Sequence, residues 1–454
     1  MGSRAPALGP EGTWHPVSWG RLPAAHHRWR RVHWRDERWW DGLEGDATVL
    51  PYGLGRSYGD SCTNDGGWLL ATAGLDRWVA WDPATGLLRA EAGVTLAEVL
   101  AMVVPQGWFL PVTPGTKFVT LGGAVANDVH GKNHHVAGTW GCWVRAFELQ
   151  RSDGSRMVCT PHDNVDWFGA TIGGLGLTGL ITWVEVQLRR VCNPYLHVET
   201  LRVGDLSAFF SLAKASDRDF EHTVSWVDCL ASGPGLGRGL FMRGDHAPSL
   251  GEALPLAKRR RTLPFPLDAP GWLLNRWSIT LFNALYWRRL RGARRADVQH
   301  YEPFFYPLDA IDDWNRMYGS RGFFQYQFVV PMPDAERVVH EVLTRIARSG
   351  EASFLAVLKC FGDVASPGWL SFPRPGVTLA LDLPNRGVST LSLMDDLDRL
   401  VGEAGGALYP AKDARMGGAM FRQSFPRWEE FASYVDPAFS SSFWRRVGGE
   451  GRKG

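Results

Sequence analysis

The chain has 454 residues, a formal net charge of +2, 45% hydrophobic residues and 21% charged residues. A chain of this length usually divides into two or three domains, each with its own hydrophobic core. The near-zero net charge excludes a global electrostatic attraction to nucleic acid, and the composition is that of an ordinary globular protein.

The cysteines and the start of the chain carry no sign of metal binding or secretion. The six cysteines are at positions 62, 142, 159, 192, 229 and 360, with no CxxC pair and no Cys/His cluster at zinc-ligand spacing. We therefore expect free thiols and no bound metal. Residues 1–20 contain no apolar core of a signal peptide, so we expect a cytoplasmic protein, with the membrane surface included.

Strand signals alternate with glycine-rich turns in the first half of the chain. Residues 47–61 are predicted to form a strand that runs into the turn GLGRSYGD, and residues 87–93 a second strand. A helix is expected to begin at Thr95, which can form a capping box with Glu98, and to end at Pro105. Strands are then expected at 144–151, 156–160 and 181–188.

From about residue 195 the pattern becomes strand, helix, strand, strand, and it occurs twice. The first set is predicted at 196–203, 206–215, 223–228 and 237–243; the second is predicted at 323–330, 334–348, 354–360 and 377–383, with a closing helix at 391–403. This order predicts an antiparallel sheet with helices on one face, and so an α+β fold class.

An apolar, tryptophan-rich segment separates the two sets. The stretch WLLNRWSITLFNALYW at 272–287 is too short to span a membrane, so we expect no transmembrane helix. It lies between basic clusters at 258–261 and 288–295. Two compatible interpretations stay open: a segment at the membrane interface, or a mobile loop that covers a groove.

Three glycine-dense loops, at 53–59, 115–123 and 173–179, lie in the first half. Glycines let a backbone approach a ligand and present N–H groups to it, so together these loops favour an extended, phosphate-containing cofactor. Plain turns are the alternative. The first loop is not the dinucleotide-binding GxGxxG motif, because no apolar-periodic helix follows Gly59. The run HGKNHH at 130–135 crowds too many polar groups together for a spacer.

These motifs carry a resemblance to a known family. LGRSYGD at 54–60, PGTKFVTLGGAVANDVHGKNHH at 114–135 and GGLGLTGLI at 173–181 resemble the flavin-binding domain of the vanillyl-alcohol oxidase type. FFYPLDAIDDWNRMYG at 304–319, FFQYQFVVP at 323–331, FLAVLKCFG at 354–362, LSFPRPG at 370–376 and LYPAKDARM at 408–416 are similar to its decaprenylphosphoryl-ribose 2′-oxidase group. The resemblance covers residues from about 15 to 450.

The resemblance implies a two-part FAD-binding domain, formed by residues 1–194 and completed by residues 408–454. A substrate-binding domain at 195–407 is inserted between the parts and contains the basic, Trp-rich loop near 250–297. The relatives with covalent flavin carry a histidine at the position of Arg56, so we expect non-covalent FAD.

The resemblance also implies the site residues. Catalytic roles fall to Lys412, His130 and Tyr58, with Lys412 as the base or site cation. The implied FAD-binding residues are Gly53, Leu54, Gly55, Arg56, Ser57, Tyr58, Gly59, Asp60, Ser61, Gly115, Thr120, Leu121, Gly122, Gly123, His130, Gly131, Lys132, Asn133, Ile181 and Tyr409. The implied substrate-binding residues are Lys132, Trp226, Tyr306, Gln325, Gln327, Lys359 and Ala380.

The residue types support some of these assignments, and two positions differ from those of mycobacterial relatives. Gln325 and Gln327 share one face of a strand, where two amides suit sugar hydroxyls, although an outward polar face would give the same pattern. A lysine acts as a base near neutral pH only when burial or a neighbouring cation lowers its pKa. Mycobacterial relatives carry a cysteine at the position of Ala380 and an amide side chain at that of Thr378.

The implied reaction is FAD-dependent oxidation of the 2′-hydroxyl of a polyprenyl-phosphoryl ribose to a keto sugar, by hydride transfer to the flavin. It would be the first half of an epimerisation to arabinose for cell-wall arabinan, completed by an NAD(P)H-dependent short-chain reductase. The implied partners are a lipid-linked or small sugar, that reductase and a peripheral membrane contact, with no nucleic acid. The alternatives are an oxidase of a soluble polyol, aldose or natural-product sugar, and a catalytically silent flavoprotein that scaffolds a glycan-assembly complex.

Overall fold

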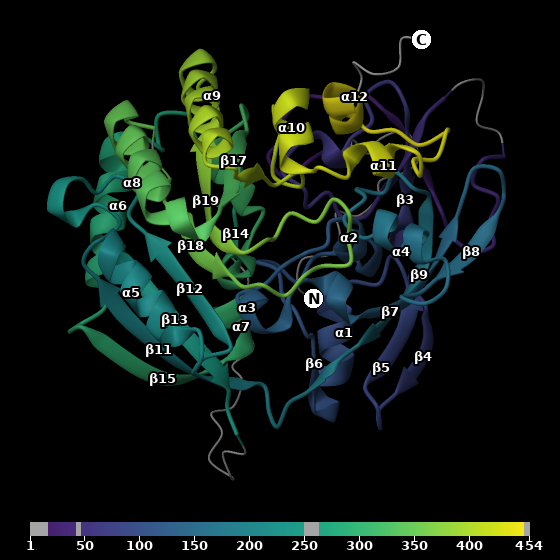
Figure 1. The fold of residues 1–454 in the computed structure, drawn as a ribbon, viewed down its shortest axis with the longest axis horizontal. Helices are drawn as coiled ribbons and strands as arrows, with labels where there is room; N and C mark the ends of the chain where they lie inside the picture. The colour runs from purple at the N-terminus through teal and green to yellow at the C-terminus, as the bar shows by residue number, and fades with distance from the viewer. Residues whose placement is uncertain (1–16, 42–46, 249–262, 352, 449–454) are drawn as a thin grey trace.

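The computed structural model describes residues 17–41, 47–248, 263–351 and 353–448, and Figure 1 shows two main sheets. The five-stranded sheet, on the right of Figure 1, is antiparallel throughout, in the order β4-β5-β9-β7-β8. Its strands are β4 (Trp78–Asp82), β5 (Leu87–Glu91), β9 (Leu180–Gln187), β7 (Val144–Gln150) and β8 (Arg156–Cys159). These bounds confirm the strands predicted from residue 87 onward.

The eight-stranded sheet is also antiparallel, in the order β15-β11-β13-β12-β18-β19-β17-β20. Its strands are β15 (Arg294–His300), β11 (Tyr195–Val203), β13 (Gly239–His246), β12 (His222–Val227), β18 (Ala356–Phe361), β19 (Gly376–Pro384), β17 (Phe323–Val330) and β20 (Ala407–Leu408). The predicted antiparallel sheet is therefore present. The sequence did not predict β15 or β20, because β20 has two residues and β15 is highly charged.

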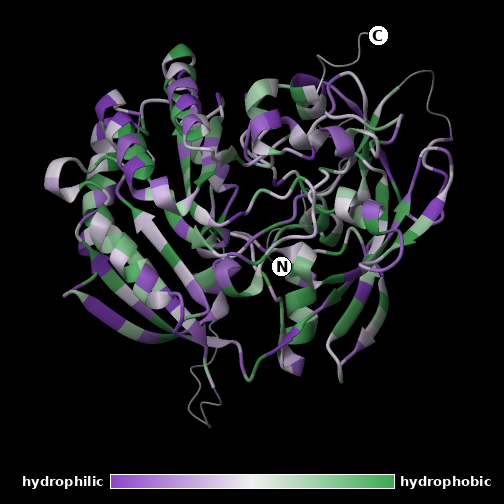
Figure 2. Cartoon of the chain, viewed as in Figure 1, coloured by the Kyte–Doolittle hydropathy of each residue, from purple (hydrophilic) through white to green (hydrophobic). Residues whose placement is uncertain are grey.

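Three helices cover one face of this sheet: α5 (Leu206–Ser216), α8 (Met332–Ser349) and α9 (Val388–Glu403). In α8, Val338, Val342 and Ile346 are fully buried at a spacing of four residues, and each contributes about 1.5–3 kcal/mol. Figure 2 shows hydrophilic and hydrophobic residues side by side along α8 and α9, as expected for helices with one face on a core. These helices confirm the predicted α+β arrangement.

The opposite face of the sheet carries side chains of the other parity. On β12, Val227 packs under the three helices, whereas Trp226 points the other way and contacts Leu240 and Leu290. The helix α6 (Arg276–Arg288) packs on this second face through Tyr286. Within the predicted loop near 250–297, residues 249–262 lie outside the described residues, and α6 is the helical part of the remainder.

The C-terminal segment returns to the start of the chain. It contains α10 (Gly418–Ser424), α11 (Trp428–Ala432) and α12 (Ser442–Gly448), drawn in yellow in Figure 1. The backbone N–H of Val49 donates to Ala438, and that of Ser442 donates to Thr63. These contacts support our proposal that residues 408–454 complete a domain begun by residues 1–194; the boundaries themselves stay a proposal.

The remaining elements are short. They are α1 (Leu96–Val103), α2 (Leu121–Ala126), α3 (His134–Ala137), α4 (Val165–Thr171), α7 (Tyr301–Phe305), the sheet β1-β3-β2 (Arg28–Arg31, Trp68–Ala71 and Val49–Tyr52), and the strand pairs β6 and β10 (Trp108–Phe109 and Arg189–Arg190) and β14 and β16 (Leu263–Pro264 and Ile311–Asp312). The predicted Thr95–Glu98 capping box of α1 is present. None of the described helices has the length and apolar character needed to cross a membrane.

Candidate functional site

A cavity of about 1250 Å³ brings together most of the predicted site residues. All three glycine-dense loops contribute to its wall, as does the face of the eight-stranded sheet opposite α5, α8 and α9. The predicted residues in the wall are Gly53, Leu54, Gly55, Arg56, Ser57, Tyr58, Ser61, Gly115, Thr120, Gly122, Gly123, His130, Gly131, Lys132, Ile181, Trp226, Gln325, Gln327, Lys359, Ala380, Tyr409 and Lys412. Residues far apart in the sequence thus face one space.

The first glycine loop offers backbone N–H groups to this cavity. Within the described part of the chain, none of the N–H groups from Gly53 to Ser57 has a hydrogen-bond partner. Gly55 has φ +61°, and a Cβ atom there would lie 2.1 Å from the hydroxyl oxygen of Tyr52. Successive unpaired N–H groups in such a turn form an anion-binding concavity, which suits a phosphate group.

Hydrogen bonds fix the end of the second loop within itself and to the chain before α1. Thr120 caps α2, and its hydroxyl accepts from the N–H of Gly123 at 3.1 Å. The N–H groups of Leu121 and Gly122 donate to Val94 and Ala92. A Cβ atom on Gly122 would lie 3.0 Å from that of Ala92, so this glycine allows α2 to pack against the chain before α1. Residues 121–123 of the second loop therefore shape the wall with N–H groups that are already paired.

Two hydroxyl groups in the wall also lack partners. The Oγ atom of Ser61 and the Oγ1 atom of Thr113 are buried, and neither has a hydrogen bond within the described residues. Buried polar groups in folded proteins are almost always hydrogen-bonded. A polar ligand in the cavity would satisfy both groups.

A cluster of polar residues lies where the glycine loops meet the sheet. The Nζ atom of Lys412 lies 3.7 Å from the ring centroid of Tyr58. The amide nitrogen of Gln325 donates to Asp382 at 2.6 Å. The amide nitrogen of Gln327 lies 3.2 Å from Nε2 of His130, on the neighbouring loop. The cluster therefore joins three segments that are distant in sequence.

Burial changes the protonation of the cations in the cluster. Burial lowers the pKa of Lys359 to about 8. Burial and the charge of Lys359 lower the pKa of Lys132 to about 7, and burial with the same neighbour holds the pKa of His130 well below its usual value. His130 is therefore neutral at neutral pH and acts as a hydrogen-bonding group.

Lys412 and Asp382 are buried groups of opposite charge that influence each other's pKa. Burial lowers the pKa of Lys412, which the charge of Asp382 opposes and that of Lys359 reinforces. Burial raises the pKa of Asp382, against a hydrogen bond from Gln325 and the charge of Lys412. Burial thus disfavours the charged form of both groups, whereas the charge of each favours ionisation of the other.

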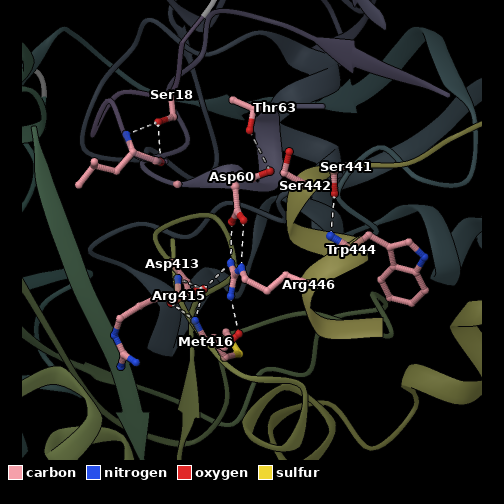
Figure 3. Close-up of polar contacts among 12 residues, drawn as sticks. Ser18, Asp60, Thr63, Asp413, Arg415, Met416, Ser441, Ser442, Trp444 and Arg446 are labelled. Atoms are coloured by element: carbon pink, nitrogen blue, oxygen red, sulfur yellow. Dashed lines mark hydrogen bonds and ion pairs between the residues drawn. The ribbon is translucent and has the colours of Figure 1, made fainter. Parts of the chain in front are cut away.

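Five predicted residues do not line the cavity. Leu121 is fully buried, because the residue after an N-cap turns into the core under α2. Asp60 is bound to Arg446 (Figure 3), and the side chain of Asn133 donates to the carbonyl of Pro111. The remaining two, Gly59 and Tyr306, are also buried behind the wall. These residues support the wall from behind rather than face a ligand.

Sequence reasoning did not identify Asp382 or the roof residues of α6. Asp382 follows Thr378 and Ala380 at intervals of two on β19, so strand periodicity was the signal that would have found it. Ile279, Phe282 and Tyr286 line the cavity from α6. Apolar residues occur on all sides of their segment, so its sequence does not show which side faces the cavity.

The ammonium group of Lys132 is already hydrogen-bonded to the protein, so it is not free for a substrate as the sequence suggested. Its Nζ atom donates to the carbonyl oxygens of Phe304 and Phe305, at the end of α7. Lys132 therefore helps to fix α7 as well as facing the cavity.

Among the described residues, Glu221, His222 and Asp245 have ligand atoms within 4.8 Å of one another. Arg189 forms an ion pair with Glu221. The guanidinium already supplies positive charge there, so the cluster is explained without a metal ion.

Comparisons with known proteins agree with this geometry. A family model described as FAD binding domain matches residues 43–160. The chain is 37% identical over 417 residues to decaprenylphosphoryl-beta-D-ribose oxidase of Mycolicibacterium smegmatis, across 89% of this chain and 90% of the relative. It is 37% identical over 377 residues to an uncharacterized protein of Streptomyces coelicolor, across 78% of this chain and 100% of the relative. Human delta(24)-sterol reductase is 28% identical over 141 residues, or 28% of this chain and 27% of the relative.

Proposed function

Because the chain belongs to the family of FAD-binding oxidoreductases that includes decaprenylphosphoryl-ribose oxidase, we propose that it oxidises the 2′-hydroxyl of a polyprenyl-phosphoryl ribose to the keto sugar. The observation that carries the proposal is the continuity of one cavity. It extends from the free N–H groups of the first glycine loop, past Lys412, to an apolar region under α6. A cofactor, a sugar and a lipid chain each have a region of matching chemistry.

The residues of the wall fit FAD. The N–H groups of residues 53–57 suit its pyrophosphate, and the unpartnered hydroxyls of Ser61 and Thr113 suit its polar groups. Arg56 stacks on Trp19, with its guanidinium carbon 4.1 Å from the ring centroid, and offers no nucleophile for a covalent bond. We therefore propose non-covalent FAD, which acid precipitation would leave in the supernatant.

Lys412 is the proposed base for the sugar hydroxyl. Its lowered pKa allows a neutral amine near neutral pH, and the charge of Asp382 favours the protonated amine once the proton has been accepted. Tyr58 stays protonated, because burial and the charge of Asp382 raise its pKa. When FAD is bound, it supplies the acceptor for the hydride that leaves the carbinol carbon.

Two amides and a lysine are proposed to orient the substrate. Gln325 and Gln327 point from one face of β17 into the cavity, where they suit hydroxyl groups of a pentose. Lys359 is a buried cation on the same sheet face, in β18, and its charge suits the substrate phosphate. Trp226, Met242 and Leu290 continue the wall as an apolar surface for the lipid chain.

The keto sugar would need a second reaction to become arabinose. Reduction of the ketone from the opposite face requires a second hydride donor, and an NAD(P)H-dependent short-chain reductase is the proposed partner. The pair of reactions would epimerise C2′ for cell-wall arabinan synthesis.

A soluble-sugar oxidase is the second candidate. Ala380 and Thr378 stand where mycobacterial relatives have larger or amide side chains, and Ala380 lines the cavity beside Gln327. This wall would hold a different sugar if the lipid were not needed. The test is anaerobic mixing of the holoenzyme with polyprenyl-phosphoryl ribose or with soluble alditols. Loss of flavin absorbance with the first alone supports the proposal, whereas loss with alditols alone selects the second candidate.

A further inference from the structure

The helix α6 has two apolar faces with different surroundings. Its inner face lines the cavity through Ile279, Phe282 and Tyr286, and the ring of Tyr286 packs tilted against that of Trp226, with the centroids 4.5 Å apart. The capping box of Asn275 and Ser278 fixes the start of the helix. α6 is therefore an ordered roof over the apolar end of the cavity.

The outer face of α6 is exposed to solvent, although its residues are strongly apolar. Trp277 is 84% exposed, Leu281 is 61% exposed and Leu285 is 60% exposed. The spacing of four residues aligns these three side chains along one side of the helix. Trp272, in the turn before α6, is 73% exposed as well. We call these four residues the α6 face.

The segment that carries the α6 face is rich in arginine. The carboxylates close to it, Asp268 and Glu351, are paired with Arg21, Arg316 and Arg386 of other segments. Between residues 269 and 296 the sequence has six arginines and no aspartate or glutamate. Arg276, Arg288 and Arg291 are exposed, and none lies within ion-pair distance of a carboxylate in the described part of the chain. In contrast, Arg294 and Arg295 are paired with Glu199 and Asp297. Three unpaired cations thus border the exposed apolar residues.

We propose that the α6 face binds an anionic lipid bilayer. Tryptophan and leucine side chains insert at the boundary between headgroups and acyl chains, and arginines next to them bind the phosphates of anionic lipids. The arrangement favours a bilayer, because a row of exposed apolar side chains with unpaired cations beside it is typical of a helix at a membrane interface. Docking would place the apolar end of the cavity at the bilayer, on the other side of one helix.

Bilayer binding is separate from the proposed reaction and can be measured without any sugar substrate. The full-length, FAD-loaded protein is sedimented with vesicles of phosphatidylglycerol and phosphatidylcholine, and with vesicles of phosphatidylcholine alone. We expect strong binding to the anionic vesicles that weakens at high salt, because surface charges are then screened. Absence of binding to the anionic vesicles would overturn the proposal, whatever the protein does to sugars.

Variants assign the binding to α6. The triple substitution Trp277→Ser, Leu281→Ser and Leu285→Ser should weaken binding about tenfold or more. Arg288→Gln with Arg291→Gln keeps the apolar residues and should weaken binding by about fivefold for each arginine removed. The matched control is Val388→Ser with Leu391→Ser on α9, where the wild-type side chains are 79% and 36% exposed, and it should bind like wild type.

The same variants separate a lipid from a protein partner. Retained binding by both the triple and the arginine variant would show that another surface meets the bilayer. Gel filtration of the wild type and the triple variant gives the second outcome. If the triple substitution converts a dimer to a monomer and the wild type ignores vesicles, the α6 face is a contact between copies of this chain and the lipid proposal is wrong.

Discussion

At the scale of single residues, the site depends on buried lysines. Lys412 lies over the ring of Tyr58, and its pKa is lowered by burial and by the charge of Lys359. The negative charge of Asp382 opposes this lowering of the pKa of Lys412. A lysine with such a lowered pKa has a sizeable neutral fraction near neutral pH, whereas a solvated lysine is almost fully charged there.

Replacing Lys412 separates proton transfer from cofactor binding. Lys412→Met removes the proposed base and should slow flavin reduction by the sugar by about 10²–10⁴-fold, while the FAD content stays unchanged. Lys412→Arg keeps a charge and has no accessible neutral form, so it should be as slow. Anaerobic stopped-flow absorbance measures both variants. Wild-type rates in Lys412→Met would remove this residue from the chemistry.

Lys359 gives a prediction about stability. Its pKa is about 8 in the folded protein against an ordinary value of 10.5, so between these values the unfolded state binds more protons and stability rises with pH. Below pH 8 the full penalty of the buried charge remains. Lys359→Met should therefore raise the free energy of unfolding at pH 7 by about 1–3 kcal/mol. The lower value applies if water in the cavity partly solvates the charge of Lys359.

The Lys359→Met comparison is made by urea unfolding at several pH values. The difference from wild type should shrink as the pH rises from 8 to 10.5. Two stability curves that stay parallel over this range would show that Lys359 is not the source of the penalty.

At the scale of elements, the C-terminal segment holds the two halves of the site together. Arg446 of α12 binds Asp60, after the first glycine loop, and Asp413, one residue after Lys412 (Figure 3). The backbones also touch, because a Cβ atom on Gly59 would lie 1.7 Å from the carbonyl oxygen of Asp413. The same contacts that close the fold therefore set Lys412 against Tyr58.

Arg446→Met tests this connection. The substitution leaves Asp60 and Asp413 buried without their cation, and it should lower the free energy of unfolding by about 3–5 kcal/mol and weaken FAD retention. The control is Arg427→Met, which removes an exposed pair with Glu430 and should cost less than about 1 kcal/mol. Equal effects of the two substitutions in thermal unfolding would contradict the role of Arg446.

At the scale of the whole molecule, much of the architecture could be predicted because its signals are local. The amphipathic period of α8 and the alternation of β17 are strong over eight or more residues. The two-residue β20 has no such signal, since its pairing with β17 depends on the whole sheet. The apolar run of α6 has no clear period, because one side meets a cavity and the other is exposed.

Part of the site could also be predicted, because some of its motifs are local in the sequence. Glycine loops and HGKNHH are visible in the sequence, and residues of all of them line one cavity. Whether a residue in such a motif faces inward depends on the local backbone. Leu121 and Asp60 belong to motifs yet point away from the cavity, whereas Asp382, outside the motifs, reaches Gln325 across the sheet.

The position of the oxidised carbon tests the central claim most directly. The holoenzyme is mixed anaerobically with polyprenyl-phosphoryl ribose that carries deuterium at C2′, and the loss of flavin absorbance is timed. We predict slower loss than with unlabelled substrate, and no slowing when deuterium is at C1′, because the C2′–H bond breaks as the flavin is reduced. Flavin that stays oxidised with this substrate, or an isotope effect at another carbon instead of C2′, would contradict the account.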